Sequence, residues 1–211
     1  FTYRNGGEAG ENTILETLGN GVGFIDFDLD GYLDLFLPGG GRLDGKQVQG
    51  HPAALLRNLG GLQFRDVSTL AHTNDDSLYS HGCQVADIDN DGFPDLLVTG
   101  FGSLLLYHNQ GDGTFLEIHK QAGLVNASWS TSAGLGDLNG DGLVDIYICN
   151  YVDWSFDNHP VCRSFDQKPD ICGPRSFKAL ADVLYFNNGD GTFRDVSATA
   201  GLVEGEERKF S

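Results

Sequence analysis

The stretch DFDLDGYLDLFL, residues 26–37, joins a cluster of acidic residues directly to an apolar segment. It recurs as DIDNDGFPDLLV at 87–98 and as DLNGDGLVDIYI at 137–148. The copies share the pattern D-x-[DN]-x-D-G-x-x-D followed by apolar residues, and their first residues lie 61 and then 50 positions apart. Repeats at such periods indicate an architecture built from repeated structural units.

A second motif alternates with the first. Each copy has an Asn, a glycine-rich turn and a Phe six residues after the Asn, and the pairs are Asn58 and Phe64, Asn109 and Phe115, and Asn187 and Phe193. Gly and Asp tolerate positive φ angles, so a turn of this kind between two apolar segments predicts a β-hairpin.

Together the two motifs predict four short antiparallel strands in each repeat. In the middle repeat we expect strands at about 82–88, 95–100, 103–109 and 115–120, with the aspartate loop joining the first two and the hairpin joining the last two. Four short strands repeated about every 50 residues are typical of the blades of an all-β β-propeller. A β-sandwich does not explain the period, and the coils of a β-solenoid are usually shorter.

The chain is therefore predicted to be one partial β-propeller domain, residues 1–211. The blades are expected at about 18–71, 80–124 and 129–202, with an insertion at 151–180 in the third blade and the start of a further blade at 203–211.

The aspartate loop predicts a cation site. Carboxylates at positions 1, 3, 5 and 9 of a nine-residue loop can converge, the glycine at position 6 allows a sharp bend, and the carbonyl at position 7 adds an oxygen. Such a set of oxygens suits Ca²⁺, which takes about 6–8 of them, better than Mg²⁺, which requires a strict octahedron. The expected ligands of three structural Ca²⁺ sites are Asp26, Asp28, Asp30, Tyr32 and Asp34; Asp87, Asp89, Asp91, Phe93 and Asp95; and Asp137, Asn139, Asp141, Leu143 and Asp145.

The alternatives for these loops are ornamental surface turns and EF-hands. Eleven of the 30 acidic residues lie in the three nine-residue windows, and this concentration argues against surface turns that bind no ion. An EF-hand is excluded because position 12 holds Leu37, Val98 or Ile148 in place of its bidentate Glu. Asn139 replaces a carboxylate in the third loop, so we expect that site to be the weakest.

Composition limits the partners. The 211 residues carry a formal net charge of −17, which argues against nucleic acid and anionic membrane surfaces. No apolar run approaches the roughly 18 residues of a membrane span. The sequence contains no Met, which is expected of a processed or excised piece of a longer product.

The aspartate loops resemble those of FG-GAP/VCBS repeat proteins, which bind calcium in β-propellers of the integrin-α type. The segments LYFNNGDGTFRDVSATAGL at 184–202 and ICNYVDWSF at 148–156 are similar to the ASPIC/UnbV group, related to cartilage acidic protein. The resemblance implies a secreted or surface propeller, often of seven blades, used for adhesion or interaction. Because three blades do not close a ring, further blades or another chain would be needed.

The insertion at 151–180 contains Cys162 and Cys172, for which we predict a local disulfide. A zinc site that adds His159 lacks a fourth ligand, and free thiols are the remaining alternative. A recognition surface formed by Trp154, Phe156, Arg163 and Phe165 is one interpretation of the insertion, and simple packing of Trp154 onto its blade is the other.

Cys83 and Cys149 lie in predicted strands, where small buried thiols are the default and a second disulfide is the alternative. The six histidines show no arrangement of nucleophile and base, and repetition of the Asp clusters favours metal over glycosidase carboxylates. We therefore expect no catalysis. The expected function is a calcium-binding extracellular, cell-surface or periplasmic scaffold for protein interaction or adhesion, and the alternative is a carbohydrate-binding or polysaccharide-degrading propeller.

Overall fold

The computed structural model describes residues 1–202, so the further blade expected at 203–211 lies outside the described residues. The described part contains β-strands and three short 3-10 helices but no α-helix. This confirms the predicted all-β fold class.

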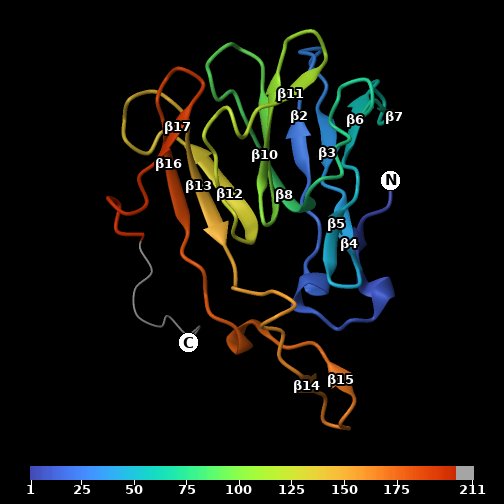
Figure 1. Cartoon of the computed structure of the whole chain (residues 1–211). Helices are drawn as coiled ribbons and strands as arrows, with labels where there is room; N and C mark the ends of the chain where they lie inside the picture. Colours follow the sequence, from blue (N-terminus) through green and yellow to red (C-terminus); the bar gives the residue numbers. More distant parts are fainter. Residues whose placement is uncertain (203–211) are drawn as a thin grey trace.

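Three four-stranded antiparallel sheets correspond to the three repeats (Figure 1). The first consists of β2 (Gly23–Ile25), β3 (Asp34–Leu37), β6 (Ala54–Asn58) and β7 (Phe64–Asp66). The second consists of β8 (Tyr79–Ala86), β9 (Asp95–Phe101), β10 (Leu104–Asn109) and β11 (Phe115–Glu117). The third consists of β12 (Ser130–Gly136), β13 (Asp145–Asn150), β16 (Val183–Asn187) and β17 (Phe193–Asp195). Each sheet is ordered as its strands follow in the chain, as expected of propeller blades.

The smaller elements lie before the first blade or between strands of the first and third blades. They are β1 (Arg4–Asn5), η1 (Gly7–Ala9), η2 (Ile14–Thr17), β4 (Gly40–Asp44), β5 (Gln47–Gly50), β14 (Cys162–Arg163), β15 (Pro169–Asp170) and η3 (Pro174–Ser176). Strands β1, β4 and β5 form a three-stranded sheet, and β14 pairs with β15.

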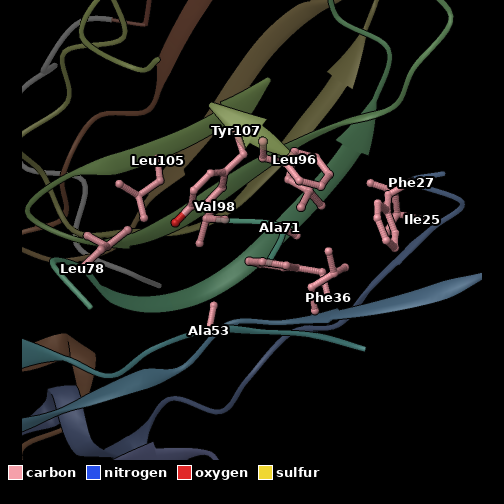
Figure 2. Close-up of a cluster of buried hydrophobic side chains, with 12 residues drawn as sticks. Ile25, Phe27, Phe36, Ala53, Ala71, Leu78, Leu96, Val98, Leu105 and Tyr107 are labelled. Carbon is pink, nitrogen blue, oxygen red and sulfur yellow. The ribbon is translucent and has the colours of Figure 1, made fainter. Parts of the chain in front are cut away.

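The second blade is buried on both faces because it lies between the other two. Leu96 and Val98 of β9 pack in one core cluster with Ile25 and Phe36 of the first blade (Figure 2). Leu97 points the other way and joins a second cluster with residues of the third blade. A strand that is covered on both sides reads as a continuous apolar run, which explains the sequence LLV in β9.

The two ends of the blades carry different kinds of connection. The connections β2–β3, β8–β9 and β12–β13 carry the aspartate loops at 26–34, 87–95 and 137–145, and we call this the loop end. In an antiparallel sheet the next connection lies at the opposite end. In the second blade it is a tight turn from β9 to β10, whereas residues 38–53 in the first blade and 151–182 in the third are insertions. We call this the insertion end (Figure 1).

The two insertions meet above the short turn of the second blade. Leu43 of β4 and Trp154 of the third-blade insertion belong to one buried cluster, together with Tyr79 and Trp129. Lys46 at the tip of the β4–β5 hairpin lies 3.7 Å from a carboxylate oxygen of Asp157. The insertion at 38–53 was not predicted from the sequence, although it occupies the same place in its blade as the predicted one.

Candidate metal centres

The backbone of each aspartate loop contains two left-handed positions. Position 6 is glycine in all three loops, with φ between 86° and 94°. Position 4 is also left-handed, and it is occupied by Leu29 (φ 55°), Asn90 (φ 60°) and Gly140 (φ 83°). Only the first loop therefore places a residue with a bulky side chain in a conformation that L-amino acids avoid.

The first carboxylate of each loop folds the loop around itself. Asp26 accepts hydrogen bonds from the backbone N–H groups of Asp30 and Gly31, both at 3.0 Å. Asp87 and Asp137 accept the same two bonds in the second and third loops, at 2.9–3.1 Å. Backbone N–H groups stabilise the charged carboxylate, which lowers the pKa of Asp137.

The last carboxylate fastens the loop to the hairpin of the same blade. Asp34, Asp95 and Asp145 are at most 1% exposed. Asp95 accepts hydrogen bonds from the backbone N–H groups of Ile88 in the loop and Asn109 in the hairpin, at 3.0 and 2.8 Å. Asp34 and Asp145 make the equivalent pairs of bonds. Burial raises the pKa of Asp95 to about 6 despite these bonds, so removing its charge from water is costly.

The structure brings several of the predicted ligands together. In the first loop, one carboxylate oxygen each of Asp26, Asp28 and Asp34 lies within 4.8 Å of the others. In the second loop, Asp87, Asp89 and Asp95 do the same, and a further group combines Asp89 and Asp91 with the ring of His108. His108 was not predicted as a neighbour of the loop, and only its position one residue before the hairpin Asn could have indicated it.

The first loop contains a direct sign that a cation fits. Oδ1 of Asp28 is buried and has no hydrogen-bond partner within residues 1–202. A buried charged oxygen without a partner is unfavourable, and a hard cation held with Asp26 and Asp34 would satisfy it. These residues could thus hold a divalent cation with a preference for oxygen ligands.

The third loop differs from the other two. In the described part of the chain, its acidic side chains form no group of three as close as those above. Asn139 turns its amide towards Asp141, with Nδ2 donating to Oδ2 at 2.9 Å. An amide thus replaces a carboxylate within the loop, which is the basis for expecting the weakest site here.

The side chains at position 7 pack on the hairpin of the same blade. Tyr32, Phe93 and Leu143 were predicted to contribute only their carbonyl oxygens. Their side chains pack over the first glycine of the hairpin turn, where an added Cβ would come within 3.5 Å of Tyr32 at Gly60 and within 2.8 Å of Phe93 at Gly111. At Gly111 this contact is too close for a side chain, whereas at Gly60 the contact is ordinary and the positive φ of 83° is what favours glycine.

The hairpin asparagines have a role that the sequence did not reveal. Nδ2 of Asn109 donates to the carbonyl of Phe27, in the aspartate loop of the preceding blade, at 2.9 Å. Asn187 makes the same bond to Ile88 at 2.8 Å. The first and second loops are thus held both by their own blade and by the next one.

In the insertion, Cys162 and Cys172 form the predicted disulfide, with their Cα atoms 5.3 Å apart. The zinc alternative is wrong because both thiols are consumed, and Nδ1 of His159 faces the indole nitrogen of Trp154 at 3.1 Å. Cys83 and Cys149 are free and half-buried, so the alternative of a second disulfide is not supported. Burial raises the pKa of the Cys83 thiol to about 12.

The four residues proposed as a recognition surface do not share one environment. Trp154 is 4% exposed and packs edge-on against Phe101 and Phe156, so it corresponds to the packing interpretation. Phe165 is fully exposed, near the tip of the β14–β15 hairpin, and Arg163 is exposed on β14. Phe156 is half-buried and lines a cavity of about 360 Å³ at the insertion end. The cavity is lined by Lys46, Val48, Ser77, Tyr79, Phe101, Gly102, Trp154, Ser155 and Phe156.

A comparison with known protein families agrees with the repeat of the aspartate loops. The profile of the FG-GAP-like repeat family matches residues 26–98 and 87–148, which include all three aspartate loops.

No curated protein matches the chain. A solved structure of a lectin from Agrocybe aegerita, described as specifically recognising non-reducing terminal N-acetylglucosamine, is similar with a TM-score of 0.39 and 16% identity. The match covers 84% of this chain and 52% of the lectin, so the chain spans about half of the lectin's length. Within residues 1–202, no helix has the length and apolar character that crossing a membrane requires.

Proposed function

The chain belongs to the FG-GAP-like repeat family, and from this premise we propose that it is a calcium-stabilised β-propeller scaffold for protein interaction. The proposal includes three structural Ca²⁺ sites at the loop end and no chemistry of its own. The buried, unpartnered Oδ1 of Asp28, beside the carboxylates of Asp26 and Asp34, is the observation that carries it.

The electrostatics of the loops support the proposal of structural calcium. The carboxylates of one loop repel each other, and a bound cation would remove that repulsion. Because the first and second loops are bonded to their own hairpin and to the next blade, an ion in either loop would stabilise the packing of blades. Binding to the folded form alone adds about 2.7 kcal/mol per site when the free ion is at a hundredfold excess over its dissociation constant.

Thermal unfolding with chelator and with added Ca²⁺ tests the proposal. We expect Ca²⁺ to raise the midpoint and Mg²⁺ at the same concentration to raise it much less. An unchanged midpoint would refute structural calcium. Asn139→Asp sharpens the test, because a fourth carboxylate in the third loop should increase the calcium-induced shift.

We further propose that the protein works outside the cytoplasm, on the cell surface, in the periplasm or after secretion. The Cys162–Cys172 disulfide supports this, because such bonds persist in oxidising compartments. The phrases at 148–156 and 184–202 support a place in the ASPIC/UnbV group. The partner surface is expected at the insertion end, where residues 38–53 and 151–180 distinguish this chain from a plain repeat.

Carbohydrate binding is the second candidate, and the cavity at the insertion end favours it. Aromatic rings of Phe101, Phe156 and Trp154 line it together with the hydroxyl groups of Ser77 and Ser155. Binding sites commonly combine such an apolar lining with a few polar groups. A glycan array followed by titration of Trp fluorescence distinguishes the candidates: saturable quenching that Phe156→Ala abolishes would favour carbohydrate, and a blank array would favour protein partners.

A further inference from the structure

The residue that precedes the hairpin Asn differs among the three repeats, although its place in the blade is the same. It is Arg57 in β6, His108 in β10 and Phe186 in β16. Arg57 and His108 both reach the aspartate loop of their own blade. Phe186 instead lies under the guanidinium of Arg194, 5.5 Å from the ring centroid. The first loop therefore contacts a permanent cation and the second a histidine, whereas the equivalent residue of the third blade is an aromatic ring that pairs with Arg194.

Arg57 contacts two of the four carboxylates of the first loop. Its Nη2 atom lies 2.6 Å from Oδ2 of Asp28 and 3.1 Å from Oδ2 of Asp30. The other oxygen of Asp30, Oδ1, accepts a hydrogen bond from the backbone N–H of Tyr32 at 3.0 Å. Both oxygens of Asp30 are thus engaged, and Asp30 is absent from the group in which Asp26, Asp28 and Asp34 converge.

The second loop has a histidine where the first has the arginine. Its fifth-position carboxylate, Asp91, is likewise absent from the group of Asp87, Asp89 and Asp95, and it converges with Asp89 and the ring of His108 instead. His108 lies 3.4 Å from Asp89, farther than Arg57 lies from Asp28. The first loop therefore has the same four carboxylates as the second, but two of them, Asp28 and Asp30, contact a permanent positive charge.

We propose that Arg57 is a built-in counter-cation of the first loop, occupying the carboxylate oxygens of Asp28 and Asp30 that a bound Ca²⁺ would otherwise share. This inference rests on the proposed calcium binding and adds a regulator to one site. The guanidinium relieves the repulsion of the loop when the ion is absent. It also lowers the affinity for the ion, because a unit positive charge a few ångströms from a divalent cation opposes binding.

The inference makes two opposite predictions for Arg57→Gln. Gln keeps much of the length of the side chain and loses the charge. In chelator, the variant should unfold at a lower temperature than the wild type because four carboxylates are left uncompensated. At the same time its first loop should bind Ca²⁺ about tenfold more tightly, since ligand charge sets affinity in such loops.

The first loop can be observed separately from the other two. Tyr32 occupies its seventh position, whereas Phe93 and Leu143 occupy that position elsewhere. Tb³⁺, a luminescent substitute for Ca²⁺, is sensitised by a nearby tyrosine ring. The Tb³⁺ signal that disappears in Tyr32→Phe therefore reports the first loop, and competition with Ca²⁺ gives its affinity. Isothermal titration with Ca²⁺ gives the total number of sites.

Arg65→Gln is the matched control. Arg65 lies directly opposite Arg57 on β7, is exposed and forms no ion pair in the described part of the chain. Its removal changes the net charge equally without freeing a carboxylate, so it should shift the affinity less than twofold. Arg57→Lys keeps the charge but not the fork of the guanidinium, and it should restore most of the stability in chelator.

Equal Tb³⁺ and Ca²⁺ affinities of the first loop in the wild type and Arg57→Gln would overturn the inference, and so would an unchanged midpoint in chelator. The strongest support for the inference would be a first loop that binds Ca²⁺ only in Arg57→Gln, while the other loops bind it in the wild type as well. If neither the wild type nor any variant binds Ca²⁺ or Tb³⁺, the proposed calcium binding is refuted, and so is the proposed competition between Arg57 and Ca²⁺. The midpoints in chelator then still decide whether Arg57 compensates the charge of the loop.

Discussion

The loop end and the insertion end of the blades are stabilised in different ways. At the loop end, the same hydrogen bonds recur three times, from the first Asp to the loop backbone and from the last Asp to the hairpin. At the insertion end, two segments without sequence similarity pack around Trp129 and Trp154. Repeated charged and hydrogen-bonding residues therefore hold the loop end together, whereas burial of apolar side chains from two unique segments holds the insertion end together.

The largest expected effect tests whether the two ends are independent. Trp154→Ala removes a buried indole and should destabilise the protein by about 3–5 kcal/mol. The calcium-induced rise of the unfolding midpoint should nevertheless persist in chemical and thermal denaturation. Phe165→Ala, in the same insertion but fully exposed, is the control and should have almost no effect. A calcium response lost together with Trp154 would show that the ends are coupled.

The next effect concerns pH at the insertion end. His81 is 3% exposed and accepts a hydrogen bond from the indole N–H of Trp129 at 2.9 Å. Burial lowers the pKa of His81 to about 4. The unfolded chain therefore takes up the proton first, and stability should fall as the pH drops from about 6.5 towards 4, by up to about 3 kcal/mol.

Urea unfolding between pH 7 and 5 measures this loss. His81→Gln keeps an acceptor for Trp129 but does not titrate, so its stability should depend less on pH in that window. Equal slopes for the variant and the wild type would contradict the assignment.

The contacts between blades at the loop end should have an intermediate effect. Asn109→Ala removes the bonds to Phe27 and Pro94 from a fully buried position, and about 2 kcal/mol should be lost. Asn58→Ala is the matched variant, because Asn58 bonds to Leu33 within its own blade. It should cost less than half as much in the same denaturation experiment. Equal losses would mean that the bond between blades contributes little.

The smallest effect is a gain in stability. Leu29 is exposed and left-handed at a position where the other loops have Asn90 and Gly140. Leu29→Asn should stabilise the protein by about 0.5–1 kcal/mol by relieving the backbone. The gain should appear both in chelator and in Ca²⁺, and a loss of stability would show that the leucine side chain makes a necessary contact.

Much of the fold could be predicted from local patterns. The middle blade was expected at 82–88, 95–100, 103–109 and 115–120, and its strands are Tyr79–Ala86, Asp95–Phe101, Leu104–Asn109 and Phe115–Glu117. The first strand begins earlier than expected because Tyr79 and Ser80 continue the pairing with β9 beyond a register shift at His81. The insertion at 38–53 was missed because it is itself a glycine-rich β-hairpin, β4–β5, and its sequence resembles the hairpins that belong to the blades.

The sequence by itself determined the repeat, the left-handed glycines and the acidic positions of the loops, because these depend on residues close together in the chain. Only the tertiary structure decided which oxygens converge, that Asn109 and Asn187 bind the preceding blade, and that Arg57 faces Asp28 and Asp30. The contacts of Asn109, Asn187 and Arg57 join residues separated by 27 to 99 positions. Their geometry depends on how strands and blades pack against each other, which no local pattern of residues specifies.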